Sequence, residues 1–363
     1  DGTIAEISYR GFYDTVEALG AVLTHMGFGI SHVACISENR YDWICVYLAV
    51  LQSAGVYVPI DRELPADDKV YLINDSESEV IFVSGKYEDW VRTNREKMPN
   101  VKCIISFDAT VNDAQILAYP LLLKQGMELD KKAYDALHSE PDELKMLVYT
   151  SGTTGTAKGV MLSEHNLVSS VYYGLQVSQI YDTALSILPY HHTYEAVCDL
   201  LVNIHFHATV CINAVMKDLV KDMQTYHPSN VYIVPAIAEF IYGNIIRNLK
   251  KQGKLGTFQK GVKISRAALK LGIDLRPKLF RELHVLFGGR LRKIVCGGAP
   301  IRPEIGAFFG DIGVALTGGY GITECSPLVS VNDENTNDYH TAGHRLACLS
   351  WMIDEPNEEG IGE

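Results

Sequence analysis

Short apolar runs alternate along this chain with longer segments whose apolar residues recur at helical spacing. The first run covers 32–36, and it is followed by a helical segment at 41–52, a run at 56–58 and a helical segment at about 66–74. Further strand-like runs lie at 80–83, 103–106, 145–149, 184–188, 230–234 and 291–295. Strands that alternate with helices predict parallel sheet with crossover helices. We therefore expect a large α/β protein that binds ligands beyond the carboxyl ends of its strands.

A change in composition divides this pattern into units. Residues 126–141 are polar and charged, which is typical of a boundary. Because 363 residues exceed what one small core needs, we expect a first αβ subdomain at 1–140 and a central αβ subdomain at 141–330. Residues 331–363 are expected to begin a third, smaller unit.

Composition excludes several classes of protein. Hydrophobic residues make up 47% and charged residues 21% of the chain, which argues against wholesale disorder. The longest uncharged run, 43–60, contains Gln52, Gly55 and Pro59, so it predicts a buried helix and strand rather than a membrane span. Eight cysteines without a CxxC pair indicate buried thiols in a reducing compartment. No signal peptide is recognisable, and we expect a cytoplasmic protein.

Charge is unevenly distributed. The net charge is −12, and so acidic a chain has no general affinity for nucleic acid. From Arg247 to Arg302, however, fifteen Lys and Arg residues face only two acids, so this stretch carries +13. Within it, Phe258, Val262 and Leu269 recur at roughly helical spacing among lysines, as in a helix at an anionic membrane surface. A solvated surface insertion is the alternative.

A loop rich in hydroxyls and glycines stands between two strand-like runs. It reads YTSGTTGTAKGV at 149–160. Glycines let backbone N–H groups approach phosphate oxygens, hydroxyls donate further bonds, and one lysine offsets charge. Ala157 stands where a Walker A loop has glycine, and no GxGxxG is present, so neither pattern applies. The alternative to a phosphate site is an ordinary polar loop. The candidate phosphate-binding residues are Thr150, Ser151, Gly152, Thr153, Thr154, Gly155 and Lys158.

Three further segments follow predicted strands. LPYHHTYE at 188–195 holds two adjacent histidines, which we expect to point in different directions and not to share a metal. IVCGGAP at 294–300 would let a flat ring approach the backbone, although it also fits a plain strand-to-helix turn. TGGYGITECSP at 317–327 includes Glu324. A separate HFH string at 205–207 predicts a strand with both histidines on one face and no third metal ligand in view.

Together these strings closely resemble the signatures of the adenylate-forming superfamily, which includes acyl-CoA and aryl-CoA synthetases. The resemblance extends over nearly the whole chain, with Ala157 replacing a proline that is common in the family. It implies the N-terminal domain of such an enzyme: stacked, mostly parallel sheets with flanking helices and, from residue 331, the start of a small β-barrel. The family's small C-terminal domain and its lysine have no counterpart here, so we expect this chain alone to turn over slowly.

The resemblance also implies a role for each motif residue. His192 would lie beside the carboxylate substrate, and Tyr320 would stack on adenine. Thr323 would hydrogen-bond the α-phosphate, while Glu324, with Thr150 as a second contact, would bind Mg²⁺. The implied catalytic residues are Lys158, His192, Thr323 and Glu324. The implied nucleotide contacts, besides the phosphate loop, are Gly297, Gly298, Ala299, Pro300, Gly319, Tyr320, Gly321 and Thr323.

The implied reaction is attack of a carboxylate on the α-phosphorus of ATP, which gives an acyl-adenylate and pyrophosphate, followed by thioester formation with CoA. The stretch at about 247–293 resembles an insertion of long-chain fatty acyl-CoA synthetases and favours a fatty acid substrate, with peripheral contact to anionic membrane. One alternative is another acid, whether aryl, amino or shorter acyl, loaded on CoA or a carrier protein. A second is a non-catalytic nucleotide-binding module.

Overall fold

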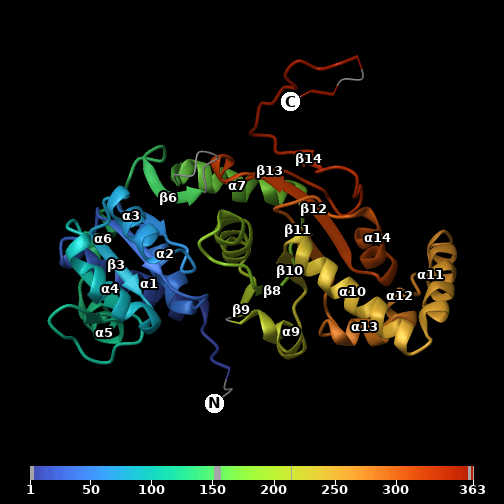
Figure 1. Cartoon of the computed structure of the whole chain (residues 1–363), viewed down its shortest axis with the longest axis horizontal. Helices are drawn as coiled ribbons and strands as arrows, with labels where there is room; N and C mark the ends of the chain where they lie inside the picture. Colours follow the sequence, from blue (N-terminus) through green and yellow to red (C-terminus); the bar gives the residue numbers. More distant parts are fainter. Residues whose placement is uncertain (1–3, 151–156, 214, 359–360, 363) are drawn as a thin grey trace.

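The computed structural model describes residues 4–150, 157–213, 215–358 and 361–362. Two seven-stranded sheets form the framework (Figure 1). The first has the order β5-β4-β3-β1-β2-β6-β7, and its pairs are parallel except for the β6–β7 hairpin. Its strands are β1 His32–Ile36, β2 Val56–Pro59, β3 Val80–Val83, β4 Cys103–Ser106, β5 Leu117–Ala118, β6 Leu144–Thr150 and β7 Lys158–Ser163.

The second sheet has the order β14-β13-β12-β11-β10-β8-β9. It is parallel from β9 to β12, and the last two strands add in antiparallel fashion. Its strands are β8 Thr183–Ser186, β9 Thr209–Ile212, β10 Asn230–Ile233, β11 Lys293–Cys296, β12 Ala315–Gly321, β13 Leu328–Val331 and β14 His344–Arg345. The α/β class with mostly parallel sheets is therefore confirmed.

The region expected to begin a barrel extends this sheet instead. β13 and β14 pair at its edge, and within the described chain no barrel closes. The sheets also change later than residue 140, because β6 and β7 still pair in the first sheet. The division into subdomains stays a prediction.

Helices cover both sheets (Figure 1). The helices that accompany the first sheet are α1 Tyr9–His25, α2 Tyr41–Leu51, α3 Ala66–Asp75, α4 Glu88–Asn94, α5 Tyr119–Glu128 and α6 Lys132–Asp135. Between the sheets lie α7 Glu164–Val177, the π-helix η3 Tyr194–Leu201 and α8 Val202–His205. Those around the second sheet are α9 Leu219–Tyr226, α10 Pro235–Lys251, α11 Leu255–Leu269, α12 Arg276–Leu279, α13 Arg281–Leu286 and α14 Pro303–Ile312.

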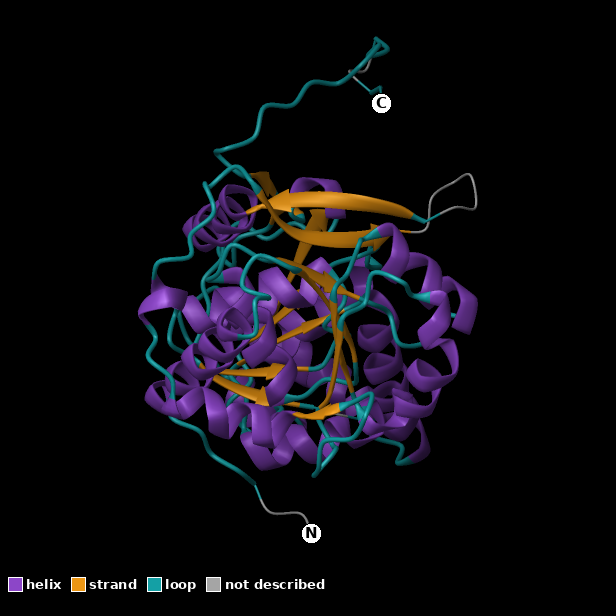
Figure 2. Ribbon diagram, turned by 90° about the vertical axis from the view of Figure 1, so that its left-hand side faces the viewer, coloured by secondary structure: helices purple, strands orange, loops and turns teal. Residues whose placement is uncertain are grey.

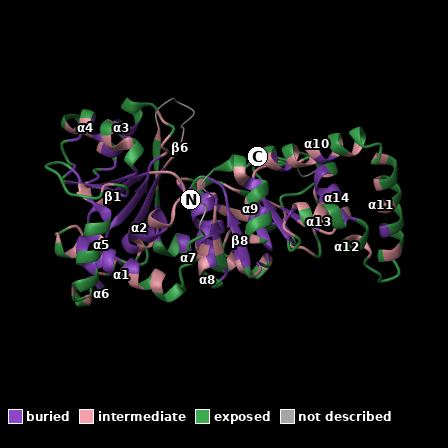
Figure 3. Cartoon of the chain, turned by 90° about the horizontal axis from the view of Figure 1, so that it is seen from below, coloured by how far each residue is buried: buried purple, intermediate pink, exposed green. Residues whose placement is uncertain are grey.

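The largest core joins the first sheet to the segments between the sheets. Trp43 of α2 lies with its ring centroid 5.1 Å from those of Tyr47 and Tyr57. On its other side it meets Tyr190, at 5.0 Å, in the loop that follows β8. The uncharged run at 43–60 is thus mostly buried, with Gln52 exposed, and its aromatic cluster supports a loop of the second sheet (Figure 3).

Some local expectations were wrong. The HFH string does not form a strand: His205 ends α8, and His207 has a left-handed φ of 59° in the turn before β9. Six cysteines are buried, but Cys325 is half-buried and Cys348 is exposed. No helix in the described part of the chain is long and apolar enough to cross a membrane.

Candidate active site

A cavity of about 540 Å³ opens where α7 and η3 meet the carboxyl ends of β10, β11 and β12. Parallel strands collect their carboxyl ends at one edge, so loops distant in sequence meet there. Three of the predicted motifs converge on this cavity. They contribute His192, Gly297, Gly298, Gly319, Tyr320, Gly321 and Thr323 to its lining.

Much of the cavity lining is apolar, and these residues were not anticipated from the sequence. η3 contributes Tyr194 and Cys198, β10 contributes Tyr232, and the segment at β13 contributes Leu328. α7 adds small residues, among them Gly174, where an added Cβ would lie 3.0 Å from Leu328 Cδ2. The four-residue spacing of Tyr194 and Cys198 on one helix could have indicated a shared face. Which cavity that face lines is decided only by packing.

The paired glycines after β11 are required by two different constraints. A Cβ on Gly297 would lie 3.0 Å from Tyr194 Cζ, and Gly298 has a left-handed φ of 88°. Tyr194 is held by its hydroxyl, which donates to the Val295 carbonyl at 3.1 Å. The backbone of this turn is therefore covered by the Tyr194 ring at Gly297 and exposed at Gly298, and its contact with adenine stays a prediction. Ala299 and Pro300 are exposed in the same turn and do not line the cavity.

The adjacent histidines lie against each other rather than pointing apart. Their ring centroids are 4.1 Å apart, and His191 Nε2 lies 3.6 Å from Asp61 Oδ2. Burial lowers the pKa of His191 to about 4 and also lowers the pKa of His192, so both rings are neutral near pH 7. Among the described residues, no three His, Cys, Asp or Glu side chains are grouped to hold a metal. His192 alone of the pair lines the cavity.

The two charged residues predicted for the site, Lys158 and Glu324, do not line the cavity. Thr323 lines the cavity, and the exposed Glu324 follows it in the 3₁₀ turn η5 Thr323–Cys325, which contacts β7. Lys158 begins β7, is exposed and lies opposite Thr150 in the hairpin ladder. Figure 2 shows long strands of the sheets as orange arrows among the helices. In the described regions neither Lys158 nor Glu324 forms an ion pair, so both charges are free to meet a ligand.

Part of the predicted phosphate loop cannot be placed. Ser151, Gly152, Thr153, Thr154 and Gly155 lie outside the described residues. The strand that follows them, β7, contacts η5. A carboxylate and a hydroxyl are the hard oxygen donors that Mg²⁺ prefers, so Glu324 and Thr150 fit the expected ion in chemical type.

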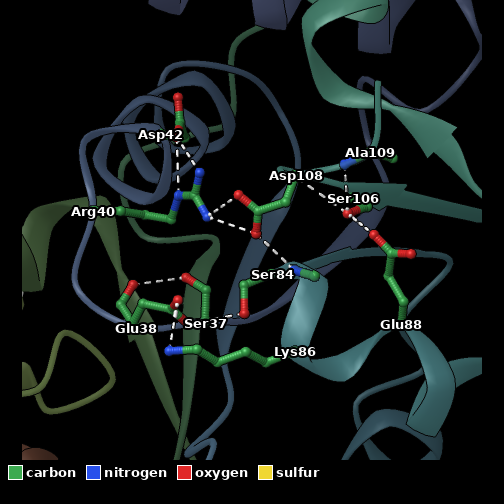
Figure 4. Close-up of polar contacts among 11 residues, drawn as sticks. Ser37, Glu38, Arg40, Asp42, Ser84, Lys86, Glu88, Ser106, Asp108 and Ala109 are labelled. Atoms are coloured by element: carbon green, nitrogen blue, oxygen red, sulfur yellow. Dashed lines mark hydrogen bonds and ion pairs between the residues drawn. The ribbon is translucent and has the colours of Figure 1, made fainter. Parts of the chain in front are cut away.

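The carboxyl ends of the first sheet carry another polar cluster, but it is closed on itself (Figure 4). Arg40 donates to Asp108 at 3.0 Å and pairs with Asp42 at 2.9 Å. Ser84 donates to Glu38, and Ser106 donates to a carboxylate of α4. Because these groups satisfy one another, the cluster closes the edge of the sheet rather than offering a ligand site.

Comparison with known proteins places these features in context. The sequence profile of the AMP-binding enzyme family matches residues 2–363. The chain is 27% identical to long chain acyl-CoA synthetase 6, peroxisomal, of Arabidopsis thaliana, over 98% of this chain and 54% of that protein. It is 26% identical to long-chain-fatty-acid–CoA ligase 1 of Cavia porcellus, over 93% of this chain and 51% of that protein. The chain thus spans about half the length of these curated relatives.

Solved structures share the fold. The anthranilate CoA ligase AuaEII, in complex with anthranoyl-AMP, superposes with a TM-score of 0.76 at 15% identity, covering 99% of this chain and 63% of that one. The long-chain-fatty-acid–CoA ligase FadD1 of Archaeoglobus fulgidus superposes with a TM-score of 0.74 at 17% identity, covering 99% and 66%. At such identity the likeness supports the architecture and not a substrate.

Proposed function

Because this chain belongs to the AMP-binding enzyme family, we propose that it activates a carboxylic acid with ATP, forming an acyl-adenylate and releasing pyrophosphate. The observation that carries the proposal is the convergence of His192, Gly297 and Thr323 on one cavity, although more than 100 residues separate the first from the second. A flat backbone for adenine, a neutral imidazole for the acid and a hydroxyl for phosphate are then within one site.

The chemistry is mainly the positioning of two anions. A carboxylate oxygen attacks the α-phosphorus, the new P–O bond forms, and the bond to pyrophosphate breaks. His192 orients the acid at the cavity wall and, being neutral, does not retain it as a salt. Thr323 donates to the α-phosphate, while Tyr320 stacks on the base. Holding both reactants in line supplies much of the rate.

Charge neutralisation falls to Lys158 and Glu324. Lys158 would approach the phosphates from β7, and Glu324 together with Thr150 would hold Mg²⁺, which would offset negative charge on the triphosphate. The exposed, unpaired state of Lys158 and Glu324 within the described structure supports this role.

We further propose that the acid is a long-chain fatty acid and that the whole protein passes the acyl group to CoA. Two observations support this: the apolar wall behind His192, formed by residues such as Cys198 and Leu328, and the printed names of the sequence relatives. The insertion-like region 247–293 is present as α10–α13. An aryl, amino or shorter acid is the competing substrate class.

The test is pyrophosphate release with Mg-ATP across acids from acetate to palmitate, with aryl and amino acids included. It is run on this chain and on a form extended past residue 363. Lys158→Ala and Glu324→Ala are expected to lose about a hundredfold in rate. Lys124→Ala and Glu128→Ala, exposed on α5 away from the cavity, serve as matched controls.

Three outcomes separate the alternatives. Pyrophosphate release that is strongest with palmitate, and that is lost in Lys158→Ala and Glu324→Ala but not in the controls, supports the proposal. Release that is strongest with an aryl or amino acid supports the adenylation reaction but assigns a different substrate class. If both forms bind ATP without acid-dependent release, the enzymatic function is wrong and the chain is a nucleotide-binding module.

The protein is also proposed to contact anionic membrane through α11, which lies at one end of the molecule (Figure 3). The expected apolar stripe does not serve this purpose, because Phe258 and Val262 pack into the second core. The outward face instead carries Ile264, 56% exposed, and beyond the helix end Leu271, 78% exposed, and Ile273, 53% exposed. The lysines around them have no ion pair in the described structure and are Lys260, Lys263 and Lys270.

Each basic residue close to an anionic surface contributes about 1 kcal/mol. Co-sedimentation with phosphatidylserine vesicles should therefore fall with salt, and it should fall more than tenfold in Lys260→Glu/Lys263→Glu. Lys124→Glu, on the other side of the molecule, is the control. Binding that is equal on neutral phosphatidylcholine vesicles, or indifferent to both changes, would contradict this contact.

A further inference from the structure

η3 and α8, which follows it directly, carry two parallel stripes of side chains with opposite character. One stripe, Tyr194, Cys198 and Val202, lines the cavity. The neighbouring stripe is shifted by one residue and is polar, although it faces the protein interior: Glu195, Asp199 and Asn203 are buried, with 0%, 1% and 0% exposure. π-helical turns are rare and often occur at functional sites. The wall of the cavity is thus backed by a row of buried polar groups, Glu195, Asp199 and Asn203, which we call the polar file.

The first member of the polar file holds the loop that carries His192. Glu195 Oε1 accepts from Ser186 Oγ at 2.6 Å, at the end of β8. The Ser186 hydroxyl lies 3.1 Å from that of Tyr190. Glu195 therefore connects β8, the loop and η3 at one point.

The rest of the polar file ties η3 to the neighbouring strand. Asp199 Oδ1 accepts from Asn203 Nδ2 at 2.5 Å, and Asn203 Oδ1 accepts from Asn230 Nδ2 at 3.3 Å. Asn230 begins β10, whose Tyr232 also lines the cavity. One oxygen of each carboxyl, Glu195 Oε2 and Asp199 Oδ2, is buried without a hydrogen-bond partner among the described residues.

Within the described parts of the chain, no cation balances the two carboxyls. The titratable groups that face them are Tyr190 from the loop, Tyr194 and Cys198 from η3, and Tyr232 from β10. Burial raises the pKa of all four, so they are neutral near pH 7. Burial likewise raises the pKa of both carboxyls, and two adjacent carboxylates cannot both ionise cheaply in a dry site.

We propose that Glu195 and Asp199 share one proton, and that this shared proton positions η3 and the loop of His192 against the substrate cavity. Both are positioning residues, since neither lines the cavity. The effect on the acid rests on the proposed function, whereas the effect on His192 does not.

The shared proton makes the arrangement sensitive to alkali. Because the folded pKa values are raised, the stabilising contribution is complete below ordinary carboxyl pKa values and is lost as pH rises through the raised ones. When the last proton leaves, two like charges face each other without water and push the helix and the loop apart. The cavity wall should then loosen above neutral pH while the first sheet is unaffected.

The test compares Glu195→Gln with Glu195→Ala. Glutamine can donate to Asp199 and accept from Ser186, so it mimics the singly protonated pair without titrating. We expect Glu195→Gln to bind palmitate as the unmodified chain does at pH 7 and to keep that affinity at pH 9, where the unmodified chain loses about tenfold. Glu195→Ala should lose about tenfold at both pH values, with ATP affinity changed less than twofold.

A readout independent of activity accompanies the binding. With histidine-selective ¹³C labelling, the His192 resonance is assigned by its loss in His192→Asn and followed from pH 6 to 10. The unmodified chain should show a second, alkaline step that Glu195→Gln abolishes. The control is Glu88→Gln, which removes a carboxyl that also accepts from a strand-end serine, Ser106, far from the cavity. It should retain the step.

The outcomes are distinct. Superimposable His192 curves in the unmodified chain and in folded Glu195→Gln would overturn the shared proton. An altered His192 curve in a chain that binds no acid would leave the positioning intact and count against the proposed function alone. Should Glu195→Gln fail to fold by circular dichroism, Asp199→Asn, which likewise keeps a single neutral partner, carries the same expectation.

Discussion

At the scale of single residues, the shape of the cavity depends on a glycine, Gly297, as much as on the polar side chains that line it. Gly297 lets the Tyr194 ring lie against the turn after β11. The ring in turn forms the wall that backs His192 in the same cavity. A motif that would be interpreted only as nucleotide contact therefore also sets the shape of the acid pocket.

Replacing Gly297 by alanine tests this coupling. The new Cβ would lie 3.0 Å from Tyr194 Cζ, so the ring must move or the turn must shift. We expect a loss of about 1–3 kcal/mol in the free energy of unfolding, measured with urea, and a weaker affinity for palmitate. Gly243→Ala on α10 is the control, since its Cβ meets nothing within 4 Å. That change should stabilise by about 0.5–1 kcal/mol.

At the scale of elements, α7 is the part most directly attached to both the hairpin and the cavity. It follows β7 at once, and Ser170 and Gly174 bring it to the cavity lining. A capping box begins the helix: Ser163 Oγ accepts from the Asn166 N–H at 3.2 Å, and Asn166 Oδ1 accepts from the Ser163 N–H at 3.0 Å. The start of α7 is thus determined locally.

Removal of this cap should affect binding as well as stability. Ser163→Ala is expected to cost about 1 kcal/mol, from thermal or urea unfolding, because one orphan N–H of the first turn loses its acceptor. Since α7 lines the cavity, palmitate affinity should fall too. Ser8→Ala removes the comparable cap of α1, where Ser8 accepts from the Gly11 N–H at 3.1 Å. If Ser8→Ala lowers palmitate affinity as much as Ser163→Ala does, the loss of affinity is a general result of lower stability and does not depend on α7.

At the scale of the whole molecule, a buried ion pair fastens the segment after β13 to the second sheet. Lys293 of β11 is fully buried, and its Nζ lies 2.9 Å from Glu334 Oε1. The same ammonium donates to Ser178 Oγ at 2.7 Å, and Ser178 lines the cavity. The Lys293 ammonium therefore connects a residue of the cavity lining, Ser178, to the segment after β13, through Glu334.

Lys293→Met should be strongly destabilising because it leaves a carboxylate without its cation. We expect a loss of about 3 kcal/mol in urea unfolding. The double variant Lys293→Met/Glu334→Leu removes both charges and should recover a large part of this loss. Equal stabilities of the single and double variants would mean that Glu334 is solvated and that the pair contributes little.

Local patterning was enough to place most elements. The runs at 80–83 and 103–106 became β3 and β4 without any change of bounds, because each is a short apolar segment between polar turns. His192 and Thr323 were assigned to one site by the resemblance of their motifs to the adenylate-forming signatures, and both line the same cavity. The HFH string failed because its polar and apolar alternation was too short to distinguish a strand from the end of a helix.

Packing alone decided the rest. No local pattern indicates that Glu195 and Asp199 face each other without a cation, because their surroundings come from β8, β10 and the intervening loop. Nor does periodicity show that Phe258 turns into the core while Leu271 remains exposed. Hydrophobic periodicity reports which residues can share a face, since it depends on backbone geometry over a few residues. What that face meets depends on side chains tens or hundreds of residues away, and these are brought together only when both sheets and α7 have packed.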